Sequence, residues 1–287
     1  MAARPRTLPA AVAPVLVGTA AAVQRVEDLH TGAFVAALAG SIFIQIGTNL
    51  ANDYSDARRG ADTAERLGPV RVTASGLATP RRVLVATWLA FAVAVAAGAY
   101  LTVVAGPLIL LVGAFSILAG VAYTGGPRPY GYSGLGEVFV FLFFGLVAVN
   151  GSYYVQLEEL AALPAGLSVA VGLLAAAILV VNNVRDIETD RRAGKLTLAA
   201  RIGRDASRRL YVSMVAGAYA ALLVTLALNG GPWWAALGLA SAPLAIRPAR
   251  AVLTRADGPS LNAALAGTGA LLGAFSLGVS AGLLIAA

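Results

Sequence analysis

Apolar residues dominate this chain in nine long segments, each separated from the next by a shorter polar stretch. A helix needs roughly 20 mainly apolar residues to cross a bilayer, and most segments approach that length. The pattern therefore predicts an all-α integral membrane protein, with nine transmembrane helices in one domain that covers residues 1–287. The predicted spans lie near residues 8–24, 32–51, 83–104, 107–124, 135–155, 163–183, 209–229, 231–247 and 262–286.

Composition and charge agree with a bundle surrounded by lipid. Hydrophobic residues make up 59% of the chain, charged residues only 12%, and the mean hydropathy is +0.79. Of the 21 lysines and arginines, 20 fall before the first span or in alternate connections, and only Arg25 falls on the other side. Because basic residues stay on the cytoplasmic side, we expect the N-terminus and these loops in the cytoplasm and the C-terminus outside the cytoplasmic membrane.

Several kinds of chemistry are excluded by composition. The chain has no cysteine, which excludes disulfides and thiolate catalysis. Its only histidine, His30, lies on the far side, so histidine-based zinc sites and Ser-His catalysis are excluded as well. The net charge of +7 is dispersed over membrane loops without a recognition module, which argues against nucleic-acid binding.

Two polar regions stand out by length, at about residues 52–82 and 183–208. Long loops in a compact bundle are usually functional, and we expect these two to form a cytoplasmic cap that shields an intermediate from water. The pattern Asn52-x3-Asp56 in the first resembles Asn182-x3-Asp186 in the second. This weak repeat suggests two related four-helix units and a ninth helix.

The acidic residues of these regions have helical spacing. Residues at i, i+4 and i+7 or i+8 share one face of a helix. The spacing predicts one stripe of Asn49, Asp53 and Asp56 with Asn52 beside it, and a second of Asn182, Asp186 and Asp190. One aspartate at a helix end is often a cap or the partner of an arginine, but such a cluster at the membrane edge indicates a functional site. Oxygen ligands of this kind suit Mg²⁺, held by carboxylates and substrate phosphates, and two clusters suit two ions.

Basic residues share the same regions. Arginine binds phosphate with two parallel hydrogen bonds and lysine binds it as a point charge. We therefore expect a diphosphate between the metal ions and the basic side chains, which would neutralise its charge as it leaves. The candidate contacts are Arg59, Arg66, Arg71 and Lys195.

At the level of whole motifs, the chain resembles the UbiA-type intramembrane aromatic prenyltransferases. The resemblance rests on Asn-Asp-Tyr-Ser-Asp-(x5)-Asp at 52–62 and Asn-Asn-Val-Arg-Asp-(x3)-Asp at 182–190. Within that superfamily the chain is most similar to the bacterial menaquinone branch, which prenylates 1,4-dihydroxy-2-naphthoate. That similarity rests on the six-residue step from Asp56 to Asp62 and on segments 3–9, 68–71, 123–137 and 194–198. The Ala- and Arg-rich composition is typical of a high-GC bacterium such as an actinobacterium.

The resemblance implies a reaction and its residues. Mg²⁺ would bind a polyprenyl diphosphate, an allylic cation would form, and the naphthoate ring would attack it with loss of CO2 to give demethylmenaquinone. The implied metal ligands are Asn52, Asp53, Asp56, Asp62, Asp186 and Asp190, and the catalytic roles carry over most firmly to Asn52, Asp56, Asp186 and Asp190. The diphosphate contacts would include Arg59, Arg71 and Lys195.

Further polar and aromatic residues are candidates for the acceptor or for the prenyl cation. Aromatic faces stabilise a cation, although tyrosines of an interfacial belt are about as common. Glu137 could equally form a structural pair with Arg128, and an asparagine in a span can simply bond across helices. The candidates are Tyr54, Tyr123, Tyr130, Glu137 and Asn150.

Two alternatives stay open at this point. The same scaffold can prenylate another acceptor, such as homogentisate, 4-hydroxybenzoate or a sugar phosphate. A cation-coupled transporter would also use paired polar stripes, although these acids cluster at one membrane face and not at the midplane. Metal-dependent release of diphosphate separates a transferase from a transporter.

Overall fold

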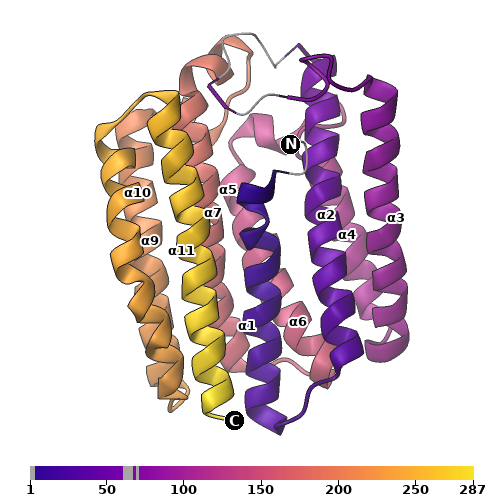
Figure 1. Ribbon diagram of the computed structural model, residues 1–287, viewed down its shortest axis with the longest axis vertical. Coiled ribbons are helices and arrows are strands. Elements are labelled where there is room, and N and C mark those ends of the chain that lie inside the picture. The colour runs from indigo at the N-terminus through magenta and orange to yellow at the C-terminus, as the bar shows by residue number, and fades with distance from the viewer. Residues whose placement is uncertain (1–3, 61–66, 69–70) are drawn as a thin grey trace.

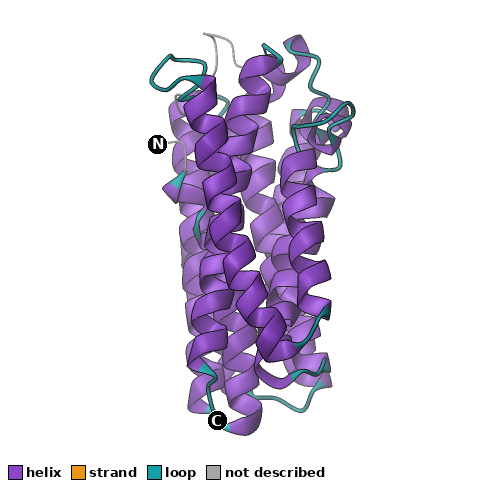
Figure 2. Cartoon of the chain, turned by 90° about the vertical axis from the view of Figure 1, so that its right-hand side faces the viewer, coloured by secondary structure: helices purple, strands orange, loops and turns teal. Residues whose placement is uncertain are grey.

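Every regular element in the described part of the chain is a helix, and the long helices run side by side along one axis (Figure 2). The computed structural model describes residues 4–60, 67–68 and 71–287. The long helices are α1 (Pro9–Val26), α2 (Thr31–Arg58), α3 (Pro80–Ala105), α4 (Leu108–Ala122), α7 (Ala162–Arg192), α9 (Arg204–Leu228), α10 (Ala242–Thr254) and α11 (Gly258–Ile285). Three consecutive elements, α5 (Gly136–Val140), the π-helical η3 (Phe141–Val147) and α6 (Ala148–Leu157), form one continuous helical segment, which we call the composite rod. The short elements are η1 (Pro5–Thr7), η2 (Tyr130–Ser133), α8 (Leu198–Ile202) and the 3-10 helix η4 (Trp233–Ser241).

Seven helices in the described residues are long and apolar enough to cross a membrane. They are α1, α2, α3, the composite rod Gly136–Leu157, α7, α9 and α11. The other two predicted segments form shorter elements. The segment predicted at 107–124 is a 15-residue helix, α4, about 22 Å long at 1.5 Å per residue. The segment predicted at 231–247 is wound first as η4 and continues as α10, so it contains no single long helix.

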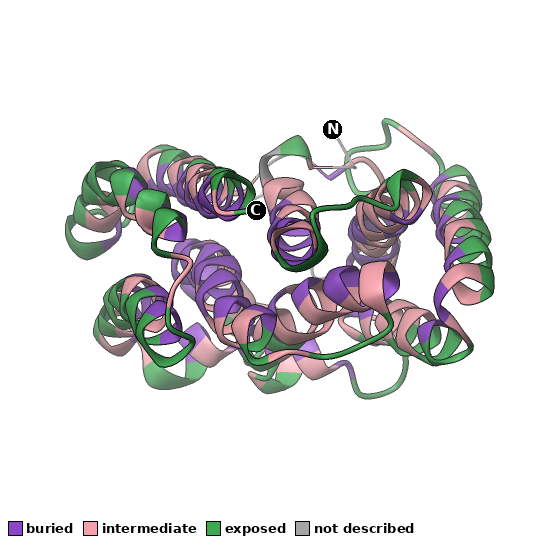
Figure 3. Ribbon diagram, turned by 90° about the horizontal axis from the view of Figure 1, so that it is seen from below, coloured by how far each residue is buried: buried purple, intermediate pink, exposed green. Residues whose placement is uncertain are grey.

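The apolar stretch of α7 is more buried than that of any other candidate membrane span among the described residues, with 72% of it inside the bundle. Figure 3 shows how buried residues gather in the middle of the bundle, away from its outer helices. Helix α7 contacts α9, α11, α1, α6 and η3. Its approach to η3 depends on two glycines, because a Cβ at Gly145 would lie 2.6 Å from the Cα of Gly172. Small residues allow helices to pack this closely where lipid supplies no hydrophobic driving force. The π turn therefore sits against the central helix of the bundle.

Connections at one end of the bundle differ from those at the other. Helix α1 begins at the upper end in Figure 1, and α11 finishes at the lower end. The upper end carries the described residues between α2 and α3 (59–60, 67–68 and 71–79) and the connections 123–135, 193–203 and 255–257, which together we call the cap. The connections at the opposite end are only a few residues long.

Both polar motifs lie inside helices, which corrects the predicted boundaries. We expected spans ending near residues 51 and 183, but α2 continues to Arg58 and α7 to Arg192. The apolar run marks where the lipid ends, while the helix continues until a residue favours another conformation. Gly60 and Gly194 follow the two helix ends with φ of 68° and 70°, the left-handed conformation that glycine adopts beyond a helix C-terminus.

Candidate active site

A cavity of about 290 Å³ connects the cap to the middle of the bundle. Its upper end is polar and is lined from both motif helices, by Asn49, Asn52 and Asp56 of α2 and by Asn182 and Asp186 of α7. Its lower arm is lined mainly by apolar and small residues of α2, α3, α4 and the composite rod. The two motifs, 130 residues apart in the chain, therefore face one cavity, although Asp53 and Asp190 of the predicted stripes do not line it.

Asp56 is the most connected side chain of the first motif. Its Oδ1 accepts a hydrogen bond of 3.0 Å from the Tyr132 hydroxyl, and its Oδ2 accepts one of 2.9 Å from Nη2 of Arg71. The Nζ of Lys195 lies 3.9 Å from the same Oδ2. Beside it, buried Asn52 accepts a bond of 2.8 Å from the Thr124 hydroxyl. The polar end therefore combines the amide of Asn52 and the carboxylate of Asp56 with two nearby cations, Arg71 and Lys195.

Asp53 points away from the cavity, unlike its neighbours in the predicted stripe. Its two oxygens accept bonds from the backbone amides of Val72, at 3.0 Å, and Thr73, at 2.8 Å. This carboxylate therefore fixes the turn that carries Arg71. Asn49 does line the cavity, and its amide donates to the Thr7 hydroxyl at 3.4 Å.

The second motif is organised by a buried arginine, Arg185. Its guanidinium donates to both oxygens of Asp186, at 2.8 and 2.6 Å, and to Oδ1 of Asn182 at 2.9 Å. It also donates to Asn262 of α11 at 2.7 Å, and Asn262 in turn donates to the carbonyl of Leu67 in the cap. Arg185 thereby fixes two cavity-lining oxygen groups and joins α7 to α11.

Asp190 lies farther along α7, beyond the cavity lining. Its Oδ2 accepts a bond of 3.4 Å from the hydroxyl of Thr197, and its carbonyl accepts one of 2.8 Å from the backbone amide of Lys195. It therefore holds the start of the α7–α8 connection. Of the predicted stripe, Asn182 and Asp186 line the cavity together.

Among the predicted basic contacts, Arg71 and Lys195 line the cavity. Arg59 is exposed and donates to the carbonyl of Gly126, with its guanidinium 5.6 Å from the centre of the Tyr132 ring. The ammonium of Lys195 lies 5.2 Å from the same ring centre. Two further candidates, Asp62 and Arg66, lie outside the described residues.

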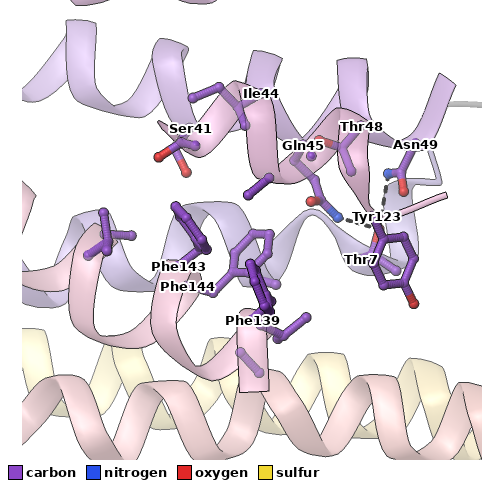
Figure 4. A pocket seen from close by; sticks show the side chains of 18 of the residues that line it. Thr7, Ser41, Ile44, Gln45, Thr48, Asn49, Tyr123, Phe139, Phe143 and Phe144 are labelled. Carbon is purple, nitrogen blue, oxygen red and sulfur yellow. Dashed lines mark hydrogen bonds between the residues drawn. The ribbon is translucent and has the colours of Figure 1, made fainter. Parts of the chain in front are cut away.

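An aromatic wall lines the cavity below the polar end. The rings of Tyr130 and Phe139 are stacked with centroids 3.9 Å apart, and Phe143 continues the series nearly parallel to Phe139 at 6.1 Å. Tyr123 meets Tyr130 edge-on, and burial raises the pKa of Tyr130, so its phenol stays neutral. Figure 4 shows Phe139, Phe143 and Phe144 across the cavity from α2. The predicted Tyr123 and Tyr130 are therefore cavity residues.

Three predicted acceptor residues lie outside the cavity lining. The Tyr54 hydroxyl accepts a bond from Arg58 on the same helix, and Asn150 donates to its own helix at Leu146. Glu137 is buried but accepts from the amide of Asn183 at 2.8 Å, which replaces the pairing with Arg128 considered from the sequence. These side chains take up structural contacts because their helices turn them away from the cavity.

Several site residues are missing from the sequence prediction. Tyr132 and Thr124 contact Asp56 and Asn52 from the connection 123–135, and Arg185 lies within the second motif itself. Tyr132 could have been found from its position in the Tyr-rich segment, two residues after Tyr130. Gln45, which lines the cavity one turn before Asn49, carries no comparable signal.

The oxygen groups of the polar end fit a hard metal ion. No group of three His, Cys, Asp or Glu side chains that could hold an ion occurs within residues 4–60, 67–68 and 71–287. Mg²⁺ does not require one, because it commonly uses one or two carboxylates, waters and substrate phosphates. Two carboxylates and three side-chain amides line this end of one cavity.

Comparisons with known proteins agree with this architecture. A Mycobacterium tuberculosis protein named 1,4-dihydroxy-2-naphthoate octaprenyltransferase is 43% identical, over 98% of this chain and 94% of its own length. A protein of that name from Escherichia coli is 38% identical, over 94% of this chain and 90% of its own. The solved structure of a UbiA homolog from Archaeoglobus fulgidus bound to GPP and Mg²⁺ has the same fold, with a TM-score of 0.64 at 14% identity over 97% and 98% of the two chains. Because residues 11–285 also match the UbiA prenyltransferase family, this multi-pass membrane protein belongs to that family.

Proposed function

We propose that this enzyme transfers a polyprenyl group from a polyprenyl diphosphate to 1,4-dihydroxy-2-naphthoate, with Mg²⁺ and with loss of CO2, in menaquinone biosynthesis. The observation that carries the proposal is the single cavity that joins both Asn/Asp motifs and two cations to an apolar arm. A diphosphate fits the polar end and an isoprenoid chain fits the arm. The choice of acceptor is supported by the names of the relatives at 43% and 38% identity.

The metal would be held at the polar end, by Asn52 and Asp56 on one side and Asn182 and Asp186 on the other. We propose two ions, with Asp190 and Asp62 as further candidate ligands. When bound, Mg²⁺ neutralises negative charge on the diphosphate and stabilises it as a leaving group. The A. fulgidus homolog bound to GPP and Mg²⁺ supports the use of this metal.

Arg71 and Lys195 would hold the diphosphate. Both reach the cavity, Arg71 from the connection between α2 and α3 and Lys195 from the connection between α7 and α8. As the bond between the allylic carbon and oxygen breaks, its electron pair leaves with the diphosphate, and preorganised cations stabilise that growing charge. Tyr132 keeps Lys195 close to Asp56 by presenting its ring to the ammonium.

The aromatic wall would serve the other half of the reaction. The allylic cation forms beside Tyr123, Tyr130 and Phe139, and an aromatic face stabilises a cation by about 0.5–2 kcal/mol. The ring carbon that bears the carboxylate attacks the cation. Loss of CO2 returns its electron pair to the ring and gives demethylmenaquinone in its reduced hydroquinone form. An apolar arm excludes water that would otherwise consume the cation.

We also propose nine membrane crossings, with the cap in the cytoplasm and the C-terminus outside the cytoplasmic membrane. The start of α1 and the end of α11 at opposite ends of the bundle support an odd number of crossings. Single cysteines test this directly, because the chain has none of its own. Ser75→Cys in the cap should resist an impermeant thiol reagent in intact cells, and Glu158→Cys at the opposite end should react with it.

An assay on purified protein in nanodiscs tests the reaction. It supplies 1,4-dihydroxy-2-naphthoate and geranylgeranyl diphosphate with and without Mg²⁺, for the wild type and for Asp56→Ala and Asp186→Ala. We expect Mg²⁺-dependent prenylated product with release of CO2, abolished by either substitution. If the enzyme turns over another aromatic acceptor but not the naphthoate, the naphthoate assignment is wrong and the transferase reaction stands. If no acceptor leads to release of diphosphate, the protein is not a prenyltransferase.

A further inference from the structure

The N-terminal turn η1 forms part of the cavity wall. The Thr7 hydroxyl accepts hydrogen bonds from the side-chain amides of Gln45, at 3.1 Å, and Asn49, at 3.4 Å (Figure 4). It also donates to the backbone carbonyl of Arg4 at 3.0 Å. These bonds fasten residues 4–7 to the polar side of α2, and both Arg4 and Thr7 line the cavity.

Stacked aromatic rings line the cavity across from α2 (Figure 4). The planes of Tyr130, Phe139 and Phe143 are inclined by only 20° and 19° from one to the next. Aromatic rings prefer offset-stacked or edge-to-face contacts with one another, so this side of the cavity favours a planar aromatic ligand. Across the cavity, Gln45 uses its amide nitrogen for Thr7, and its carbonyl oxygen is the group that can accept a ligand hydroxyl.

Three cations line the cavity within the described residues, namely Arg4, Arg71 and Lys195. Arg71 and Lys195 lie 2.9 and 3.9 Å from Asp56, so they belong to the diphosphate end. Arg4 precedes η1, which is bonded through Thr7 to Gln45 and Asn49 of α2. Its backbone has φ 49°, an uncommon conformation for a residue other than glycine, and such residues cluster at ligand sites.

We infer that Arg4, Thr7 and Gln45 form the binding site for the aromatic carboxylate acceptor, against the wall of Phe139 and Phe143. A carboxylate in an apolar cavity needs a cation and hydrogen bonds, and the arginine fork matches it. Gln45 accepts from a ring hydroxyl, while a diphosphate bound at the metal end repels the carboxylate from there. This inference rests on the proposed function and names its acceptor site.

The assignment replaces residues that the sequence suggested for the acceptor. Tyr54, Glu137 and Asn150 are bonded elsewhere and do not line the cavity. The proposed site also explains how the enzyme could bind its substrate in preference to its product. A substrate that keeps its carboxylate gains the contact with Arg4, and the product, which has lost it as CO2, does not.

Two probes that differ only in the carboxylate test the site, 1-hydroxy-2-naphthoate and 1-naphthol. Their binding to the full chain in nanodiscs is measured by calorimetry, for the wild type, Arg4→Gln and Arg4→Lys. Arg128→Gln is the matched control, because Arg128 is exposed at the same end and does not line the cavity. Gln45→Leu is a second variant, which should weaken both probes because it removes the acceptor for the ring hydroxyl.

The wild type should bind the carboxylate at least about tenfold more tightly than the naphthol, as expected for a hydrogen-bonded charged group. Arg4→Gln should remove that preference with naphthol affinity unchanged, and Arg4→Lys should restore part of it. An unchanged preference in Arg4→Gln, or equal loss in Arg128→Gln, would overturn the inference. If Arg4→Gln does not fold, a wild type without the preference, or unchanged binding of both probes in Gln45→Leu, overturns it. Turnover of 1,4-dihydroxy-2-naphthoate is measured in parallel, so failure of the proposed function is seen separately from failure of the site.

Discussion

Asp53 offers the sharpest test of how the first motif works, because its sequence suggests a metal ligand and its contacts suggest an anchor for the cap. Both carboxylate oxygens accept backbone amides, from Val72 and Thr73, directly after the cavity-lining Arg71. We predict that Asp53→Asn weakens binding of the diphosphate by loosening this turn, while the Mg²⁺ requirement stays close to that of the wild type.

The magnitude follows from the two hydrogen bonds. A bond to a charged group contributes about 1.5–3 kcal/mol. Asparagine keeps one acceptor oxygen without charge and turns an NH2 group toward the second amide, so closing the turn loses roughly 2 kcal/mol. That corresponds to a factor of about 30 in the closing equilibrium. The KM for the prenyl diphosphate should therefore rise by as much as about 30-fold.

Steady-state kinetics with varied diphosphate and varied Mg²⁺ separate the two roles. Asp56→Asn should raise the Mg²⁺ concentration at half-maximal rate, and Asp53→Asn should not. In a double-mutant cycle, Asp53→Asn and Arg71→Gln should be non-additive, since both act through the same turn. Ser75→Ala, in that turn but with only a 3.4 Å bond to Val72, is the control. A Mg²⁺ requirement raised equally in both aspartate variants, with diphosphate KM unchanged, would refute the anchor.

Three further predictions concern the rest of the cavity. Tyr132→Phe removes the bond to Asp56 but keeps the ring beside Arg59 and Lys195, so the Mg²⁺ requirement should rise a few-fold with little change in the KM for the diphosphate. Tyr132→Leu removes the ring as well and should raise both the Mg²⁺ requirement and this KM. Equal effects of the two variants would contradict separate roles for the hydroxyl and the ring. Gly113→Leu should lower turnover of long prenyl donors by more than about tenfold and spare geranyl diphosphate, because Gly113 lines the apolar arm and has open space at its Cβ position. Gly273 has equally open space but lies outside the cavity lining, so the control variant Gly273→Leu should leave the donor preference unchanged. Chelation by EDTA should abolish diphosphate release and added Mg²⁺ should restore it in the wild type but not in Asp186→Ala; metal-independent release would contradict a metal at Asn182 and Asp186.

Much of the architecture could be predicted from the sequence because lipid imposes a simple rule on length and polarity. The helical class and the position of most long helices follow from apolar runs alone. The helix ends did not follow, since α2 and α7 extend past the apolar run until Gly60 and Gly194. The glycines were visible in the sequence, but an apolar run marks the membrane and not the end of the hydrogen-bonded helix.

The partners of the site residues were harder to predict, because they come from distant segments. Tyr132 is 76 residues from Asp56, and Asn262 is 77 residues from Arg185. Such contacts depend on how the cap connections fold back over the helices. Tyr54 and Asn150 show the converse, since polar side chains near the site in sequence bond within their own helices.

The first motif shows why spacing alone could not assign its ligands. On a helix the series 49, 53, 56 and the series 49, 52, 56 are both acceptable faces, because steps of three and four residues each return to the same side. The structure uses the second, with Asn49, Asn52 and Asp56 on the cavity, and leaves Asp53 about 100° away from Asn52, where the cap turn meets the helix. Adjacent residues of one motif can thus divide the work, Asn52 and Asp56 facing the substrate and Asp53 holding the turn that brings Arg71 to it. A motif of this kind specifies both faces of the helix, and only the contact between α2 and residues 71–73 decides which carboxylate belongs to which face.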